Sequence, residues 1–534
     1  MKKVLSCLLV CVLALSIFFT GCKNEGKQVI EGVQIALSDN EITVDGEKIT
    51  NDNTQAVYSA NDIVFYLEGQ DFKYGEGTKD DEHSQEEADS HTVVHITKPG
   101  RYVLSGELSA GQVAVDLGED AEKDPEAVVT LILNDVDITC TVAPAIIFYN
   151  VYECGTDDEE TATKDVDTSK AGANVIIADG TENNITGSYV AKIYKSYELN
   201  EDGTEVVDSK KLHKYDGAFY SKKSMNIYGG DKGNGALNIY AENEGLDTEL
   251  HLTINGGIIN ITAGNDGINT NEDNVSVTTV NGGTLNILCD GGTGEGDGID
   301  SNGWLVINGG KVFSQACSTS GDAGIDSDKG IYINGGEVVA TGNMLDHIAG
   351  GDQNYAVFTF STQQKGENKF TIKNANKKKV AIFNTTNSFT YLIVSGDYFT
   401  EGDYSIWKNN ENLSVAQMNG QQMQRPGNME MPEGMTPPEN MGERPQMPDG
   451  MEPPEGFDGK NPFEDMGNPP QKPENMGERP ELPEGMTMPE GMTPPNGMQG
   501  GGNPMGGNIS VENASTTFTI VKGGNQFMVV STEK

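Results

Sequence analysis

The sequence is poor in the residues from which zinc sites and nucleophilic active sites are usually built. It has seven cysteines and six histidines in 534 residues, and it contains no Cys-x-x-Cys pair, no His-Glu-x-x-His motif and no serine within a Gly-x-Ser-x-Gly turn. These absences argue against a zinc hydrolase and against a hydrolase with a serine nucleophile. Four of the cysteines could still form disulfides in an oxidising compartment, namely Cys140, Cys154, Cys289 and Cys317.

Positive charge is also scarce. Lysine and arginine together number 36 against 81 aspartates and glutamates, which leaves a net charge of -45. Such a surface repels phosphate backbones, so we expect no nucleic-acid partner. It also repels itself unless cations lie within it, which favours cation binding.

Long apolar runs are absent after the N-terminus. Met1-Lys2-Lys3 precedes an apolar run from Val4 to Phe19, which is too short to span a bilayer comfortably, and Phe19-Thr20-Gly21-Cys22 resembles a lipobox. We therefore predict a lipoprotein signal peptide over residues 1–21 and a lipid on Cys22, with an ordinary secretory leader as the alternative. The mature protein would be extracellular and held at the outer face of the cytoplasmic membrane, and we expect it to be a monomer.

What the sequence does contain is an internal repeat. Five segments of alternating apolar residues end in Gly-Gly, and four of them read Asn-Gly-Gly. Their first glycines lie 27, 26, 27 and 26 residues apart. Regular spacing of this kind is typical of proteins built from stacked repeats. The five glycines are Gly229, Gly256, Gly282, Gly309 and Gly335.

Each repeat contains short strands and no helical period. Alternation over four to six residues indicates half-buried strands, with Leu252, Ile254, Ile259 and Ile261 pointing inward. Glycine corners separate the strands. The pattern predicts an all-β protein folded as a right-handed parallel β-helix with coils of about 26 residues. Stacking would also align the repeated asparagines into a ladder of amides at Asn255, Asn281, Asn308 and Asn334.

The composition divides the chain further. Residues 417–508 hold 15 of the 19 methionines and 18 of the 21 prolines, a composition that cannot bury a core and is expected to be a disordered insertion. We predict a linker with the first strands over 22–90, the β-helix over 91–416, and strands over 509–534 that return to it.

Acidic residues recur at one corner of the coils. Asp247, Asp300 and Asp326 occupy equivalent positions, with Asn269 between the first two, and alternation places all four on the outer surface. Carboxylates stacked one coil apart repel each other and need a counterion. Hard oxygen ligands suit Ca²⁺, so we predict calcium in this cluster, the alternative being a solvated acidic face. The other candidate ligands are Asp297, Asp322 and Asp328.

Two further sets of residues could contact a glycan. Trp304, Phe313 and Tyr332 are predicted to point outward, where aromatic rings can stack on sugars, unless loops pack over them. A polysaccharide lyase would need a basic residue beside its cation, and Lys311 and Lys329 are the candidates, although solvated lysines are common.

The corner and turn motifs carry a resemblance to a known family. Gly296-Asp297-Gly298-Ile299-Asp300-Ser301-Asn302-Gly303 and Ile307-Asn308-Gly309-Gly310 are similar to segments of bacterial secreted carbohydrate-binding β-helix proteins, and the resemblance covers roughly residues 90 to 415. It implies a pectate-lyase-like right-handed parallel β-helix that contains calcium and binds cellulose or polygalacturonate-like polymers without cleaving them.

Three functions therefore remain open. The leading hypothesis is a non-catalytic, calcium-stabilised lipoprotein that binds polysaccharide at the cell surface. The second is a calcium-dependent polysaccharide lyase that uses Lys311 or Lys329. The third is a structural surface adhesin.

Overall fold

The structure, a computed structural model, describes residues 30–200, 202–418 and 514–530 and is all-β. The predicted signal peptide, the lipidation site Cys22 and residues 419–508 of the predicted Met/Pro-rich insertion lie outside these residues. Within the described part, no helix has the length and hydropathy needed to cross a bilayer. The described cysteines Cys140, Cys154, Cys289 and Cys317 are free thiols.

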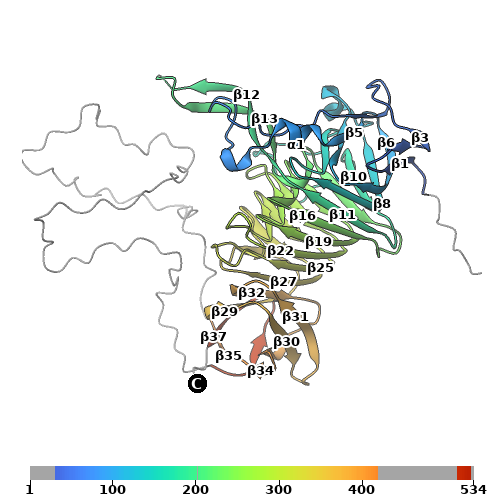
Figure 1. The fold of residues 1–534 in the computed structure, drawn as a ribbon. Helices are drawn as coiled ribbons and strands as arrows, with labels where there is room; N and C mark the ends of the chain where they lie inside the picture. Colours follow the sequence, from blue (N-terminus) through green and yellow to red (C-terminus); the bar gives the residue numbers. More distant parts are fainter. Residues whose placement is uncertain (1–29, 201, 419–513, 531–534) are drawn as a thin grey trace, which may run out of the picture. The chain divides into compact units, whose positions relative to one another are not determined.

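Three ladders of parallel strands occupy the middle of the chain, and each ladder gains one strand per repeat (Figure 1). We name them the corner ladder, the Asn-Gly-Gly ladder and the long ladder, in the order in which the chain visits them. The corner ladder contains β5 (Thr92–Ile96), β7 (Gly111–Asp116), β9 (Ile146–Asn150), β14 (Gly217–Ser221), β17 (Glu244–Thr248), β20 (Ile268–Thr270) and β23 (Ile299–Ser301).

The other two ladders also contain one parallel strand from each repeat. The Asn-Gly-Gly ladder contains β10 (Ala173–Ile177), β15 (Met225–Gly229), β18 (Leu252–Ile254), β21 (Val277–Val280), β24 (Trp304–Ile307), β26 (Gly330–Ile333) and β28 (Ile348–Gly350). The long ladder contains β11 (Glu182–Gly187), β16 (Ala236–Ala241), β19 (Ile258–Ala263), β22 (Thr284–Cys289), β25 (Lys311–Gln315) and β27 (Glu337–Gly342).

Both ends of the ladders carry antiparallel strands, so the sheets are mixed. The N-terminal elements are β1 (Val33–Leu37), β2 (Thr43–Val44), β3 (Glu47–Lys48), β4 (Val57–Ala60), the 3₁₀ turn Lys79–Asp81, α1 (Gln85–Asp89), β6 (Gly100–Leu108), the 3₁₀ turn Glu119–Lys123, β8 (Val129–Cys140), and the hairpin β12 (Val190–Leu199) and β13 (Val206–Tyr215). Strand β8 pairs in parallel with β6 on one side and with both β10 and β11 on the other, so this one strand contributes to two ladders.

The C-terminal strands depart from the expected continuation of the repeat. They are β29 (Tyr355–Gln364), β30 (Asn368–Asn374), β31 (Lys379–Thr385), β32 (Phe389–Ser395), β33 (Gly402–Lys408), β34 (Glu411–Asn412), β35 (Ser414–Gln417), β36 (Phe518–Ile520) and β37 (Gly524–Val530). Strand β32 runs antiparallel to both β27 and β29, whereas β37 is parallel to β29. Aromatic side chains in these strands, among them Phe358, Phe370 and Phe527, belong to a hydrophobic core separate from that of the ladders.

The predicted inward-facing residues of the repeats are buried. Leu252, Ile254, Ile259 and Ile261 are at most 2% exposed and belong to one hydrophobic core that follows the ladders. Two continuous stacks of asparagine amides accompany this core on the outside. The predicted one joins Asn255, Asn281, Asn308 and Asn334 through Nδ2–Oδ1 hydrogen bonds of 2.8–2.9 Å. The second joins Asn184, Asn238, Asn260 and Asn286 in the same way.

Glycine at the corners allows neighbouring strands of the ladders to approach closely. A Cβ on Gly267 would lie 2.2 Å from Cγ2 of Ile287 and 2.6 Å from the carbonyl oxygen of Gly298. We therefore predict that Gly267→Ala lowers the free energy of unfolding by about 1–3 kcal/mol through overpacking. Gly321→Ala is the control, because a Cβ there meets nothing within 4 Å. Equal urea midpoints for the two variants would contradict the prediction.

Candidate functional site

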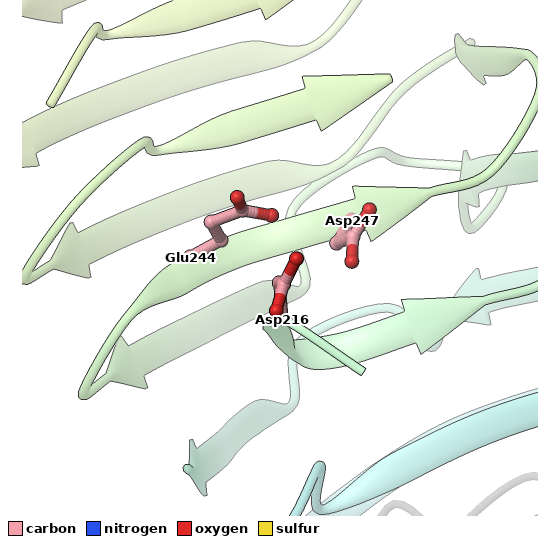
Figure 2. A group of neighbouring side chains, drawn as sticks. All are labelled: Asp216, Glu244 and Asp247. Carbon is pink, nitrogen blue, oxygen red and sulfur yellow. The ribbon is translucent and has the colours of Figure 1, made fainter. Parts of the chain in front are cut away.

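Three buried carboxylates meet where the corner strands begin. Asp216 directly precedes β14, whereas Glu244 and Asp247 belong to β17, which pairs with β14 (Figure 2). One oxygen of each residue lies within 4.8 Å of the others. The exposed fractions are 7%, 5% and 0% for Asp216, Glu244 and Asp247. We call these residues the carboxylate trio.

Two asparagines from the next repeat, in and just after β20, contact the trio. The side-chain amide of Asn269 donates to Oε1 of Glu244 at 3.0 Å, and that of Asn271 donates to Oδ1 of Asp247 at 2.5 Å. Asn269 is 7% exposed, yet its Oδ1 has no hydrogen-bond partner among the described residues. Asn269 thus brings a buried carbonyl-type oxygen next to Glu244, and together with the three carboxylates it makes a donor set that fits a hard cation such as Ca²⁺.

A second acidic group lies farther along the same ladder. The backbone N–H of Asp297 donates to Oδ1 of Asp266 at 2.7 Å, and the N–H of Ala323 donates to Oδ1 of Asp297 at 2.5 Å. Burial, followed by the charges of Asp326 and Asp266, raises the pKa of Asp297 to about 10. Burial and the charge of Glu244 likewise raise the pKa of Asp266 well above its ordinary value.

The predicted metal ligands are thus divided between two groups, and their exposure differs from the prediction. Asp247 belongs to the carboxylate trio, and the charge of Asp326 acts on the carboxyl of Asp297. Asp322 accepts a hydrogen bond from the N–H of Gly296 at 2.6 Å, Asp300 is half-buried in register with Asn269, and Asp328 is exposed.

The predicted position on the outer surface is wrong for three of the four corner residues, because Asn269, like Asp247 and Asp326, is buried. Asp247 is 0% and Asp326 is 4% exposed. The outward side of the corner ladder is covered: every residue of β14 and β17 is buried, and the ring of Tyr215 at the end of the β12–β13 hairpin packs on Tyr220 at 4.9 Å. Alternation separates inward from outward positions, but it does not reveal what covers the outward ones.

The predicted aromatic residues do not form one platform. Trp304 and Tyr332 lie on adjacent strands of the Asn-Gly-Gly ladder, whereas Phe313 lies on the long ladder. All three are half-buried. Lysine side chains lie against two of the rings: Nζ of Lys329 is 5.6 Å from the centre of the Trp304 ring, and Nζ of Lys164 is 5.2 Å from that of Tyr332.

The two candidate catalytic lysines are engaged in ion pairs. Nζ of Lys311 lies 3.4 Å from a carboxylate oxygen of Glu337, and Nζ of Lys329 lies 3.7 Å from one of Glu159. Neither partner belongs to the carboxylate trio, and Lys311 is on the long ladder rather than the corner ladder.

Sequence reasoning missed two members of the trio. Asp216 lies in the Asp-Gly corner pattern but is absent from the predicted ligands, and Glu244 replaces the aspartate of that pattern in the next repeat. Aligning the Asp-Gly pairs across coils, with Glu244-Gly245 included, would have identified both. The structure makes this correspondence explicit, because the N–H of Glu244 donates to the carbonyl oxygen of Asp216.

A known protein family matches the part of the chain that contains the repeated motifs. The family model described as "Carbohydrate-binding domain-containing protein" matches residues 90–400. This chain belongs to that family. A relative of the same description from Acetivibrio thermocellus is 27% identical over 263 residues, which is 49% of this chain. The match spans 65% of the relative's own length.

One solved structure is also similar to the chain. It is described as "Structure of the polysaccharide lyase-like protein from C. thermocellum, Gadolinium derivative". It is 21% identical, covers 60% of this chain and 99% of its own, and has a TM-score of 0.31.

The raised pKa of Asp297 predicts how stability depends on pH in metal-free buffer. Between its ordinary value of 3.8 and about 10, the native carboxyl keeps a proton that the unfolded chain releases. The native state then binds more protons, so the free energy of unfolding should fall as pH rises from about 4 towards 10. Urea unfolding in EDTA at pH 5 and pH 8 measures this fall.

Asp297→Asn serves as the comparison, because its side-chain oxygen can still accept from the N–H of Ala323. It should show a smaller loss of stability between the two pH values than the wild type does. An equal or larger loss in the variant would contradict the assignment.

Proposed function

We propose that this protein is an extracellular, lipid-anchored polysaccharide-binding protein without catalytic activity. The observation that carries the proposal is the match of the carbohydrate-binding family over residues 90–400, the region that contains most of the parallel ladders. In this proposal the ladders wind as a right-handed parallel β-helix, and a lipid on Cys22 holds the monomeric protein at the outer face of the cytoplasmic membrane. The alternative of a structural adhesin predicts no retention on any glycan.

Calcium is the proposed cofactor, held by the carboxylate trio and Oδ1 of Asn269. Three carboxylates in such a small buried volume would repel each other strongly if they were ionised and alone. A divalent cation would offset that repulsion, and all of the available donors are oxygens. The second acidic group around Asp297 and Asp266 is a further place where a cation would relieve repulsion.

The placement of the lysines favours binding over cleavage. A lyase needs a neutral basic group next to the acidic carbon of its substrate. Lys311 is 64% exposed at its side chain and paired with Glu337, which is not a member of the carboxylate trio. Lys329 is paired with Glu159 and lies against Trp304. We therefore keep the lyase as the alternative and propose a binding protein.

Calcium should stabilise the folded protein. At a free concentration one hundred times the dissociation constant, a ligand bound only by the native state adds about 2.7 kcal/mol. We predict that calcium raises the melting temperature of the wild type, and that Asp247→Asn removes most of this increase. Glu198→Gln, a change at an exposed glutamate of the β12–β13 hairpin, should keep it. An equal response of all three proteins in differential scanning calorimetry would contradict the placement of calcium.

Retention on insoluble polysaccharide tests the function itself. In calcium, the full-length protein should sediment with insoluble cellulose or pectin, and incubation with polygalacturonate should produce no rise in ultraviolet absorbance from unsaturated uronate. Absence of retention on every polysaccharide would contradict binding. A steady rise in absorbance that Lys311→Ala or Lys329→Ala abolishes would establish the lyase instead.

A further inference from the structure

A polar groove runs across the outside of the Asn-Gly-Gly ladder. It has a volume of about 490 Å³ and lies between the segment 164–169 and the outward side chains of β15, β18, β21, β24 and the turn that follows β26. It therefore crosses five neighbouring strands of one ladder. At a strand spacing of 4.7–4.9 Å this corresponds to a length of about 19 Å.

The floor of this groove is the first amide ladder. Asn255, Asn281, Asn308 and Asn334 all line it. Each amide carries two N–H donors and an oxygen with two lone pairs, and the ladder bonds of an inner member such as Asn281 use one of each. Each inner amide therefore keeps a donor and an acceptor that it can offer to a ligand, repeated at every strand.

The walls of the groove contain one aromatic ring and a segment of chain that is hydrogen-bonded to the ladder. Tyr228 is half-buried at one end of the groove. The segment 164–169 is tied down by Thr168, whose hydroxyl donates to Oδ1 of Asn226 at 2.8 Å and is 2.7 Å from the hydroxyl of Thr253. Thr168 is 5% exposed, so this wall is fixed to the ladder rather than resting loosely on it.

The charge of the groove is negative. Its lining contains Lys164, Asp165 and Asp167, and Nζ of Lys164 is already 2.6 Å from Oδ1 of Asp165. Hydrogen bonds from Ser169 lower the pKa of Asp167, so that carboxylate is ionised at neutral pH. A carboxylated polysaccharide would meet like charge here, whereas a neutral one would not.

We propose that this groove binds a single, extended chain of an uncharged polysaccharide, with successive sugar hydroxyls bonded to successive asparagines. This inference rests on the proposed function and specifies the ligand class of its site. Straight, β-linked chains stay extended over several sugars, as a straight row of regularly spaced donors and acceptors requires. Tyr228 supplies the ring on which one sugar face can stack.

Calorimetric titration of the full-length protein in calcium tests the inference, with cellohexaose and a galacturonate oligomer of equal length as probes. Cellohexaose should bind at least about tenfold more tightly than the galacturonate oligomer. Asn281→Ala and Tyr228→Ala should each weaken cellohexaose binding about tenfold.

Two matched variants control for the loss of a ladder amide or a tyrosine. Asn260 occupies the middle of the second amide ladder with hydrogen bonds of 2.8 Å, and Tyr240 is 50% exposed on a strand of the long ladder. Asn260→Ala and Tyr240→Ala should bind cellohexaose as the wild type does. If the groove variants also bind like the wild type while the polysaccharide pull-down succeeds, the groove is wrong and the proposed function stands. If the wild type binds no glycan at all, both fail.

A charge reversal on the exposed segment provides a test that does not depend on the ladder. Asp167→Lys should raise affinity for the galacturonate oligomer about tenfold and leave the affinity for cellohexaose within about twofold. Tighter binding of the galacturonate oligomer than of cellohexaose by the wild type, or no change in either affinity with Asp167→Lys, would overturn the charge selectivity.

Discussion

Parallel pairing in register is the constraint on which the rest of this structure depends. When β14, β17, β20 and β23 pair in parallel, equivalent residues of successive repeats lie about 4.8 Å apart. Repetition in the sequence thereby becomes contact in space. Apolar residues such as Ile261 then build a continuous core, and asparagines become hydrogen-bonded stacks. Acidic residues become clusters of neighbouring carboxyl groups, such as the carboxylate trio.

The carboxylate clusters and the groove both arise from the repeat, but they differ in charge and in exposure to solvent. The corner ladder concentrates carboxyl groups inside the protein, where burial and neighbouring carboxylates raise the pKa of Asp266 and of Asp297. The Asn-Gly-Gly ladder instead presents neutral amides to a groove at its outer surface. A cation proposed at the corner ladder would stabilise the fold. The Asn-Gly-Gly ladder would then offer a rigid, regularly spaced row of hydrogen-bonding groups. In this account the corner ladder would stabilise the fold by binding a cation, and the Asn-Gly-Gly ladder would recognise the polysaccharide.

Much of this organisation could be predicted from the sequence, because period and alternation are local properties. The all-β class, the buried Leu252 and Ile259, and the amide stack through Asn281 follow from spacing alone. Exposure of the corner could not be predicted, because the β12–β13 hairpin that packs on Tyr220 lies outside the repeat. Glu244 could not be predicted from the repeated aspartate because it departs from it, whereas Asp216 follows the Asp-Gly pattern and could have been predicted. The antiparallel C-terminal strands could not be predicted from the 26-residue repeat, because their largely aromatic core is formed by residues outside it.

The most direct test of the central claim is the calcium content of the purified protein. After gel filtration in metal-free buffer, without prior chelation, mass-spectrometric metal analysis should find calcium in at least stoichiometric amount in the wild type. Asp247→Asn should retain clearly less. If the wild type retains no calcium and its melting temperature is unchanged by EDTA, the buried carboxylates are held by protons and hydrogen bonds alone, and the calcium-stabilised fold proposed for this protein is contradicted.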